Sequence, residues 1–275
     1  MNTLLTIKSA TKTYGVQTED TLNFISKYAA AETSFFVIDQ TVYDLYTSAF
    51  SEIPPARLFL LEAKEENKTI ETALTICEKI IELNSKRNTR LFSFGGGIIQ
   101  DITGFLANIL YRGIHWTFVP TTLLAACDSC IGGKSSLNYK NYKNLLGTFF
   151  PPDEIIIYAD FFKTLSRKDL LSGLGEVVKF NIIAGEDTMC SVQRSLDSLI
   201  NCDMAEIKKF IQSSLMFKKT FIEADEFDRN ERIKLNFAHT FGHAIEVSSH
   251  YEIPHGTAVA MGVIVANAIS RSEEH

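Results

Sequence analysis

The sequence predicts an α/β domain built on a parallel sheet, followed by an all-helical domain. Up to about residue 160, short β-branched or aromatic runs alternate with segments that carry apolar residues at helical spacing. Such alternation is typical of a parallel sheet covered by helices. Beyond that point the strand-like runs stop and long amphipathic segments follow one another. We therefore expect an α/β domain over residues 1–160 and a helical domain over residues 161–275.

The individual elements follow from length and periodicity. Buried strands are expected where a short run is almost wholly apolar, at residues 35–38, 58–61, 90–94, 116–119 and 154–158. Apolar residues at helical spacing predict helices over residues 65–83, 98–111, 167–183, 190–199, 204–224, 235–248 and 257–270. Pro151-Pro152 marks a turn before the last strand and places the domain boundary near residues 158–165.

The composition is that of a soluble globular enzyme, with 45% hydrophobic and 22% charged residues. A formal charge of −6 argues against a nucleic-acid or anionic-membrane surface. The N-terminus lacks the features of a secretory signal, and no apolar run approaches the roughly 18 residues of a membrane span. Five scattered cysteines indicate reduced thiols in a cytoplasmic protein.

Two of these cysteines form the pair Cys127-Asp-Ser-Cys130. A structural zinc site would need a second pair at similar spacing, and the sequence contains none. We therefore expect two buried thiols beside a loop, and not a redox pair.

Three glycines, Gly95 to Gly97, follow a predicted strand and open a predicted helix. Glycine lets the backbone approach a ligand closely, and a helix N-terminus offers unpaired N–H groups to a phosphate. The spacing differs from the G-x-G-x-x-G fingerprint of dinucleotide-binding folds. A phosphate-binding turn and a purely structural tight turn are both compatible with this pattern.

A segment rich in hydroxyls runs from Pro120 to Lys134, and Asn138, Lys143 and Asn144 follow it. Its Gly-Gly pair before Lys134 permits a left-handed or closely packed backbone that aims this lysine. Lysines beside an asparagine suit a substrate that carries phosphate or carboxylate. We favour a binding role over a solvated loop, because exposed loops seldom carry glycines at such positions.

Four of the six histidines lie within residues 239–255. His239 and His243 are four apart on a helical pattern and therefore share a face, and His255 lies in a turn before the next helix. Glu176 supplies a carboxylate from a separate helix. Histidines with a carboxylate and an open position describe a catalytic divalent-metal site, most often zinc. Spacing alone leaves the ligand set open, and the pair four apart is the simplest choice.

Basic residues in the helical half, Lys179, Lys218 and Arg232, could form an anion pocket, with Arg232 close to Asn236. Ordinary helix-surface charges are the commoner explanation for such residues. Their spacing gives only weak support for the pocket.

Together these segments resemble the 3-dehydroquinate synthase family of sugar-phosphate cyclases, from about residue 37 to residue 262. The motifs that carry the resemblance are Gly95-Gly-Gly-Ile-Ile-Gln-Asp-Ile-Thr-Gly-Phe105, Tyr111-Arg-Gly113, Pro120-Thr-Thr-Leu-Leu-Ala125, Asp128-Ser-Cys-Ile-Gly-Gly-Lys134, Lys143-Asn144, Gly175-Glu-Val-Val-Lys179, Asp225-Glu226, residues 235–246 and His255-Gly256. The resemblance implies a dehydroquinate synthase-like fold, in which a Rossmann-like NAD-binding domain precedes a helical domain that binds metal and substrate.

The resemblance also implies roles at matching positions. Glu176, His239 and His255 would hold Zn²⁺ or Co²⁺, while His243 would face the substrate. The residues expected at the NAD are Asp39, Glu65, Lys68, Gly95, Gly96, Gly97, Asp101, Thr121, Thr122, Leu124, Lys143, Thr164 and Leu165. The residues expected at the substrate are Asp128, Lys134, Asn144, Lys179, Lys218, Arg232, Asn236 and His243. Arg112 resembles the arginine that reaches the neighbouring subunit's site, which implies a homodimer.

The implied activity is that of a lyase, which converts a phosphorylated heptulosonate to 3-dehydroquinate and phosphate in the shikimate pathway of aromatic amino-acid biosynthesis. In this family, bound NAD oxidises a ring hydroxyl polarised by the metal, phosphate is eliminated, and the hydride returns. An intramolecular aldol reaction then closes the carbocycle. NAD is regenerated in each turnover, so the enzyme's contribution is mainly positioning and charge stabilisation.

The chain departs from the family pattern at four positions. Thr41 stands where the family usually has asparagine, Asn230 and Tyr142 replace glycines, and Ala238 replaces another small residue of the histidine motif. The sequence also stops at His275, where relatives continue for further helices that bring another lysine to the substrate. We therefore expect the helical domain to be incomplete at its C-terminus.

Three alternative functions remain open. The residues around the cysteine pair and Tyr142 are compatible with a sugar-phosphate cyclase of secondary metabolism. A metal-dependent polyol dehydrogenase would share the architecture but would consume NAD stoichiometrically. A truncated chain could also bind NAD without any turnover.

Overall fold

The computed structural model describes residues 2–83 and 86–273. The chain folds into two compact units. The first comprises the residues up to Thr121 together with Ser129–Ala159, and the second comprises Thr122–Asp128 and the residues from Asp160 onward. The second unit therefore takes a short segment from the first half of the sequence.

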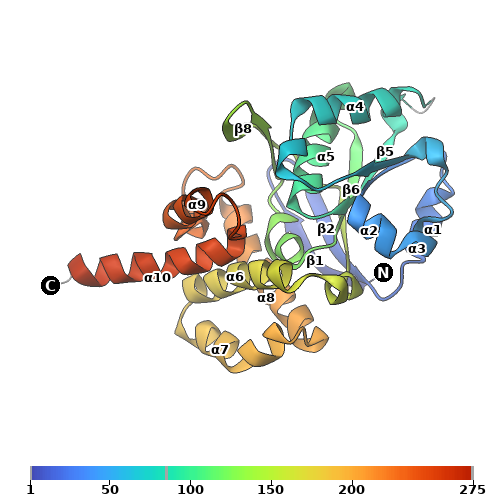
Figure 1. Ribbon diagram of the computed structural model, residues 1–275. Helices are drawn as coiled ribbons and strands as arrows, with labels where there is room; N and C mark the ends of the chain where they lie inside the picture. Colours follow the sequence, from blue (N-terminus) through green and yellow to red (C-terminus); the bar gives the residue numbers. More distant parts are fainter. Residues whose placement is uncertain (1, 84–85, 274–275) are drawn as a thin grey trace. The chain divides into compact units, whose positions relative to one another are not determined.

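The first unit is built on a seven-stranded sheet in the order β1-β2-β9-β6-β5-β3-β4 (Figure 1). The strands are β1 (Asn2–Lys8), β2 (Thr13–Glu19), β3 (Ser34–Asp39), β4 (Leu58–Leu61), β5 (Arg90–Gly95), β6 (His115–Pro120) and β9 (Glu154–Tyr158). All neighbouring strands pair in parallel except β1, which runs antiparallel to β2. The predicted α/β fold and all five predicted strands are confirmed.

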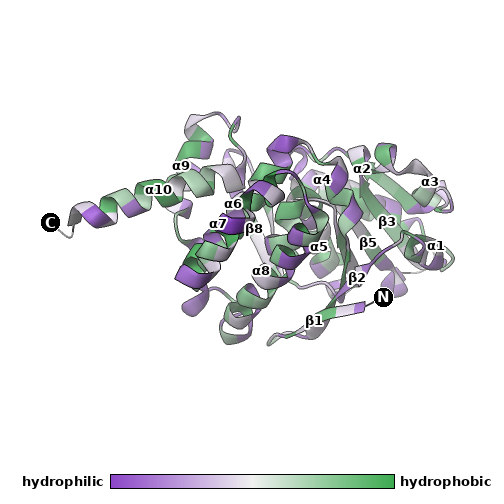
Figure 2. Ribbon diagram, turned by 90° about the horizontal axis from the view of Figure 1, so that it is seen from below, coloured by the Kyte–Doolittle hydropathy of each residue, from purple (hydrophilic) through white to green (hydrophobic). Residues whose placement is uncertain are grey.

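The central strands are apolar along their length because both faces of the sheet are covered. In β3, the residues from Phe35 to Ile38 are fully buried. Phe36 stacks on Phe92 of β5 with ring centroids 5.1 Å apart, so aromatic packing adds to the ladder of backbone hydrogen bonds. Figure 2 shows β3 and β5 in the colours of hydrophobic residues. The carboxyl ends of these strands carry several of the residues expected at the NAD.

Two antiparallel hairpins were not predicted from the sequence. The first hairpin joins β1 to β2. In β2 only alternate residues, Tyr14 and Val16, are buried, and a glycine and polar residues occupy the other positions. The second hairpin joins β7 (Lys134–Tyr139) to β8 (Tyr142–Phe149) as a separate two-stranded sheet. Its β8 strand is largely exposed, so it lacks the continuous apolar run that identifies a buried strand.

The helices of the first unit are α1 (Phe24–Ala29), α2 (Gln40–Leu45), α3 (Thr47–Phe50), α4 (Ile70–Ile81) and α5 (Gly97–Ile109). The prediction that a helix begins at residue 65 is wrong, because Glu65–Asn67 forms a separate 3-10 turn. Thr69 then caps α4 by accepting a hydrogen bond from the Thr72 amide at 3.3 Å.

The second unit is helical, as predicted. Its helices are α6 (Arg167–Ala184), α7 (Glu186–Ile200), α8 (Met204–Ala224), α9 (His239–Ser248) and α10 (His255–Glu273). The prediction that a helix begins at residue 235 is wrong. A 3-10 turn covers Glu231–Asn236, and Ala238 has a φ of 66°, which breaks the helical path just before α9. Among the described residues, no helix combines the length and hydropathy of a bilayer span.

Candidate active site

The glycine turn joins β5 to α5 in the first unit. A Cβ on Gly95 would lie 2.4 Å from a side-chain carbon of Ile99, so packing alone requires glycine there. A Cβ added at Gly97 would have no described heavy atom within 4 Å. This open space lies at the N-terminus of a 13-residue helix whose N-cap, Gly96, provides no side-chain hydrogen bond. Packing therefore requires glycine at Gly95, whereas at Gly97 the turn leaves open space beside the N-terminus of α5.

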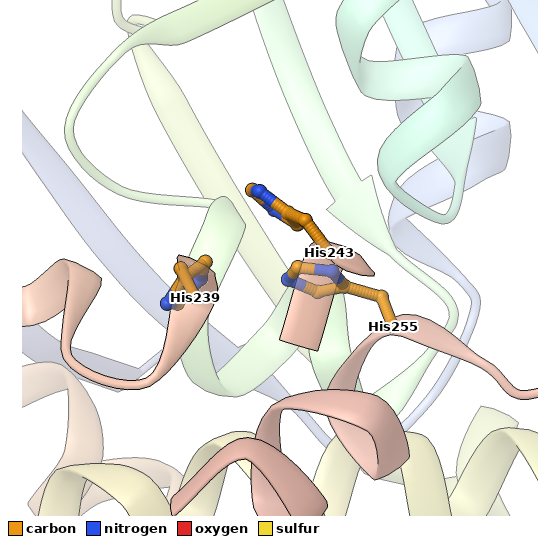
Figure 3. A group of neighbouring side chains, drawn as sticks. All are labelled: His239, His243 and His255. Atoms are coloured by element: carbon orange, nitrogen blue, oxygen red, sulfur yellow. The ribbon is translucent and has the colours of Figure 1, made fainter. Parts of the chain in front are cut away.

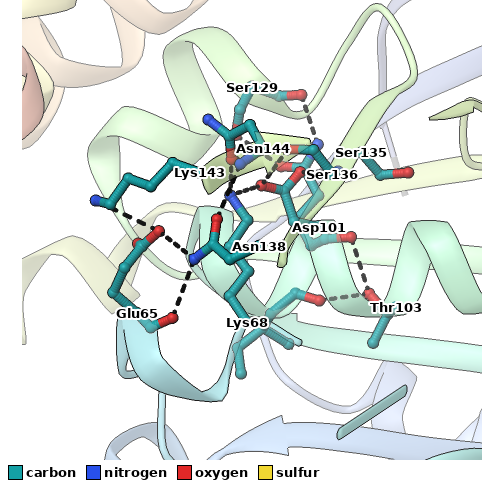
Figure 4. A network of polar contacts seen from close by, with 12 residues as sticks. Glu65, Lys68, Asp101, Thr103, Ser129, Ser135, Ser136, Asn138, Lys143 and Asn144 are labelled. Carbon is teal, nitrogen blue, oxygen red and sulfur yellow. Dashed lines mark hydrogen bonds and ion pairs between the residues drawn. The ribbon is translucent and has the colours of Figure 1, made fainter. Parts of the chain in front are cut away.

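A network of polar contacts surrounds Lys68, a lysine that is 7% exposed (Figure 4). Its ammonium forms an ion pair with Asp101 and donates a 2.7 Å hydrogen bond to Oδ1 of Asn144. The backbone N–H of Ser136 donates to Oδ1 of Asp101 at 3.1 Å. Burial raises the pKa of Asp101, although the charge of Lys68 opposes this effect. The network fixes the β7–β8 hairpin to α5 and to the turn before α4.

The same network extends to Glu65 through Asn138 (Figure 4). The Asn138 amide donates to Oε1 of Glu65 at 2.8 Å, and the Lys143 ammonium lies 3.4 Å from the same oxygen. Oδ1 of Asn138 accepts the backbone N–H of Asn144 at 2.9 Å, which supports the left-handed φ of 54° at Asn144. The structure thus brings together five of the predicted site residues, namely Glu65, Lys68, Asp101, Lys143 and Asn144.

Ser136 was not predicted as a site residue, and Asn138 was named only as part of the segment after Lys134, without a partner or a role, although both make direct contacts in this network. Sequence spacing could not identify these contacts, because the partners Asp101 and Glu65 lie 35 and 73 residues away in the chain.

Other predicted residues of the first unit lie apart from this network. Asp39 caps α2 by accepting the Thr41 N–H at 2.9 Å. Thr121 directly follows β6 and donates its backbone N–H to the Gly95 carbonyl at 2.9 Å. Lys134 is exposed at the start of β7, and Arg112 is exposed with a φ of 67°.

Four predicted NAD residues belong to the second unit. Thr122 accepts the Ala125 N–H through its hydroxyl at 3.2 Å, and Leu124 is half-buried in the same turn. Thr164 ends the 3-10 turn Ala159–Thr164 and is exposed, while Leu165 follows it.

Three histidines converge in the second unit. His239 and His243 lie one turn apart on α9, and His255 is the first residue of α10 (Figure 3). One ring nitrogen from each lies within 4.8 Å of the others. Glu176 of α6 faces the group, with Oε1 at 3.6 Å from Nε2 of His255 and at 3.9 Å from Nε2 of His239. All four groups proposed from the sequence thus meet at one place.

Glycines bring the backbones of α6 and α10 together at this place. A Cβ on Gly175 would lie 1.9 Å from the carbonyl oxygen of Gly256, and a Cβ on Gly256 would lie 1.9 Å from the carbonyl oxygen of Ser172. Each glycine directly neighbours a site residue, Glu176 or His255. The close approach therefore sets the distance between carboxylate and imidazole.

The charges around Glu176 fit a bound cation. The carboxylate is fully buried, and its Oε1 accepts no hydrogen bond from any described residue. Lys179 lies 2.5 Å from the other oxygen, Oε2. Burial raises the pKa of Glu176, while it lowers the pKa of His239 to about 3, with help from the Lys179 charge. A buried oxygen without a donor, facing two imidazole nitrogens, suits a divalent metal.

Asp128 and Lys218 form a second charged pair in this unit. The Lys218 ammonium lies 2.7 Å from Oδ1 of Asp128 and donates to its backbone carbonyl at 2.7 Å. Burial alone would raise the pKa of Asp128, but Lys218 and Lys179 together hold it well below its ordinary value. Asp128 is therefore an ionised acceptor at neutral pH, and the pair is oriented by two contacts.

Arg232 is buried, and its guanidinium donates to the Glu226 carbonyl. Asn236 is exposed at the end of the same 3-10 turn. Cys127 and Cys130 are both buried, and neither forms a disulfide with a described residue, which confirms the expectation of buried thiols.

Comparison with known proteins assigns the chain to a family. Residues 58–172 match the model of the 3-dehydroquinate synthase N-terminal region, and residues 173–275 match that of its C-terminal region. A 3-dehydroquinate synthase of Streptococcus equi subsp. equi is 33% identical over 96% of this chain and 75% of its own length. The chain belongs to the 3-dehydroquinate synthase family. The resemblance inferred from the sequence motifs is confirmed.

Two further comparisons give the extent of this relationship. A 3-dehydroquinate synthase of Clostridium tetani is 38% identical over 86% of this chain, and the chain covers 64% of that protein's length. Among solved structures, a 2-deoxy-scyllo-inosose synthase complexed with carbaglucose-6-phosphate, NAD⁺ and Co²⁺ has a TM-score of 0.87 and 26% identity, covering 98% of this chain and 77% of that one. The chain thus spans about two thirds to three quarters of the length of these family members.

Proposed function

We propose that this chain carries the catalytic centre of a 3-dehydroquinate synthase, which uses NAD and a divalent metal to convert a phosphorylated heptulosonate to 3-dehydroquinate and phosphate. The observation that carries the proposal is the meeting of Glu176, His239 and His255, in which a buried carboxylate oxygen faces both imidazoles and accepts no hydrogen bond from the described part of the chain. Family membership and the identity to named 3-dehydroquinate synthases support the reaction class.

We assign the metal to Glu176, His239 and His255, and the proposed ion is Zn²⁺ or Co²⁺. When bound, the metal would polarise an oxygen on the reacting carbon and NAD would accept and return a hydride. Lys179 forms an ion pair with Oε2 of Glu176 and opposes the rise in the pKa of this carboxyl that burial causes, and its contact with Oε2 leaves Oε1 for the metal. The low pKa of His239 keeps that ring neutral and able to act as a ligand. His243, the exposed member of the cluster, is assigned to the substrate.

The NAD residues in the first unit are proposed to act through the network around Lys68. Two cationic groups, Lys68 and Lys143, are each held by a carboxylate. The accessible N-terminus of α5 at Gly97 offers backbone N–H groups to a phosphate. The remaining residues assigned to NAD are Asp39, Glu65, Gly95, Gly96, Asp101, Thr121, Thr122, Leu124, Thr164 and Leu165.

The substrate is proposed to meet the basic groups of the second unit. Lys179, Lys218 and Arg232 are almost fully buried, so their contacts with an anion would be charge-assisted hydrogen bonds at low local dielectric. Asp128 orients Lys218 by two contacts. The other residues assigned to the substrate are Lys134, Asn144, Asn236 and His243. Arg112 is proposed to act across a homodimer in the cytoplasm, and light scattering would report a mass of about twice 30.8 kDa.

Phosphate release distinguishes the proposed reaction from the alternatives. The assay compares a phosphorylated heptulosonate with glucose 6-phosphate and with sedoheptulose 7-phosphate, each with NAD and Zn²⁺. Release only from the heptulosonate supports the proposal, whereas turnover only with an uncarboxylated sugar would point to a cyclase of secondary metabolism. Net accumulation of NADH would indicate a polyol dehydrogenase, and NAD binding without turnover would indicate a non-catalytic chain.

The ligand assignment has its own test. We expect His255→Ala to abolish zinc binding, measured by equilibrium dialysis, while NAD affinity stays within about twofold of that of the unmodified chain. If His243→Ala removes the metal and His255→Ala does not, the assignment is wrong and the two histidines of α9 form the site.

A further inference from the structure

Glu246, which has no role in the proposed metal, NAD or substrate sites, contacts the proposed metal ligand His255. It lies on α9, seven residues after His239 and three after His243, so the three side chains share one face of the helix. Its Oε2 lies 3.0 Å from Nδ1 of His255. The Glu246 side chain is 14% exposed. Helix α9 therefore carries one proposed metal ligand, His239, and also a carboxylate, Glu246, that contacts a second proposed metal ligand, His255.

This contact determines which nitrogen of His255 carries the proton. A neutral imidazole has one N–H and one lone pair, and an ionised carboxylate can only accept a hydrogen bond. Of the two carboxylates that face this ring, Glu246 lies within hydrogen-bond distance at 3.0 Å and Glu176 does not, so in the neutral ring Nδ1 is the donor and the lone pair is left on Nε2. Nε2 is the nitrogen that lies 3.6 Å from Oε1 of Glu176. The ring thus presents its lone pair toward the place where the other ligand groups meet.

We propose that Glu246 is a positioning residue that holds His255 in the Nδ1–H tautomer and fixes its ring orientation, so that Nε2 is available to a divalent metal. The inference rests on the proposed metal site. A carboxylate that accepts from a ligating histidine also raises the basicity of the ring, and loss of such a partner typically lowers metal affinity about 10–100-fold.

Three variants test this role. Glu246→Ala removes the acceptor, and Glu246→Gln keeps an acceptor oxygen of the same shape without the charge. Glu252→Gln is the matched control, because it removes the same charge from an exposed residue of the loop that leads to His255. Unfolding midpoints of all three identify any variant that fails to fold, and Glu246→Gln preserves the size of the side chain.

The first measurement needs no metal. In the metal-free protein labelled with ¹⁵N-histidine, at a pH where the ring is neutral, we expect His255 to be protonated on Nδ1. In Glu246→Ala we expect a shift toward the Nε2–H tautomer, whereas Glu252→Gln keeps the original one. An Nε2–H tautomer in the unmodified chain would overturn the proposal.

The second measurement is zinc affinity, by competition with a chromophoric chelator. We expect Glu246→Ala to weaken binding about 10–100-fold, Glu246→Gln to weaken it less, and Glu252→Gln to leave it unchanged. Equal affinities of Glu246→Ala and the unmodified chain would overturn the role of Glu246. An unmodified chain that binds no zinc would instead refute the proposed metal site, and the tautomer measurement would still decide which nitrogen Glu246 fixes.

Discussion

Replacement of Gly175 by alanine should separate Glu176 from His255 without touching either side chain. The added Cβ would lie 1.9 Å from the Gly256 carbonyl oxygen and 2.4 Å from its carbonyl carbon. Both obstructing atoms belong to the backbone, so no side-chain rotation relieves the contact. Helix α6 or the start of α10 must therefore move.

The size of this movement follows from the same geometry. Real Cβ contacts essentially never fall below 3.0 Å, so the separation must grow by at least the difference between 3.0 and 1.9 Å, which is 1.1 Å. Metal–ligand distances tolerate only about 0.2 Å of deviation. The displacement is several times larger, so one ligand should be lost. We expect zinc affinity to fall by more than about 100-fold, and the free energy of unfolding by about 1–3 kcal/mol from overpacking.

Competition for zinc with a chromophoric chelator and urea unfolding measure the two effects. Gly15→Ala is the control, because no described heavy atom lies within 4 Å of a Cβ at Gly15. The control should bind zinc as tightly as the unmodified chain. If Gly175→Ala also binds zinc with unchanged affinity, close packing of α6 and α10 does not set the metal site.

Three further predictions concern stability and pH. Lys68→Met should lower the free energy of unfolding by about 3 kcal/mol, because it leaves the Asp101 carboxylate without its buried partner; a loss below about 1 kcal/mol in urea unfolding would show that the ion pair contributes little. The pKa of Asp225 is lowered by hydrogen bonds from three backbone N–H groups, those of Arg229, Asn230 and Arg232. The ionised Asp225 carboxylate therefore stabilises the fold above about pH 4, and this stabilisation is lost as the pH falls through the lowered pKa of the folded state. Asp225→Asn should therefore destabilise the fold at pH 7 and have a smaller effect at pH 3, and equal effects at both pH values would contradict this. Ala238→Gly should raise the free energy of unfolding by about 0.5 kcal/mol, because relief of a left-handed φ outweighs the extra chain entropy of glycine; a lower thermal midpoint would count against strain at this residue.

The sequence was most informative where burial is continuous. The strand at Phe35–Ile38 is apolar at every position because helices cover both faces, so composition alone identifies it. In β2, by contrast, the two buried residues Tyr14 and Val16 are separated by a glycine and followed by polar residues, so no continuous apolar run marks the strand. The start of α9 was missed because Leu235 and Phe237 continue the helical spacing, whereas the left-handed backbone of Ala238 interrupts it.

In the candidate site, too, the sequence predicted which residues share one element but not which residues from distant elements are in contact. Helical spacing places His239 and His243 on one face, since both lie on one element. Contacts such as that between Lys68 and Asn144, 76 residues apart, depend on the fold and leave no trace in spacing. The same holds for Glu246, which reaches His255 only because the chain reverses between α9 and α10. The choice of metal ligands came from family resemblance, and the structure brings all the candidates together.

The most direct test of the metal site is anomalous X-ray diffraction at the zinc edge from zinc-loaded crystals. The proposal predicts one peak per chain within bonding distance, about 2.0–2.2 Å, of Oε1 of Glu176 and of Nε2 of both His239 and His255. A peak bound by His239 and His243 without Glu176, or no peak near these residues, would contradict it.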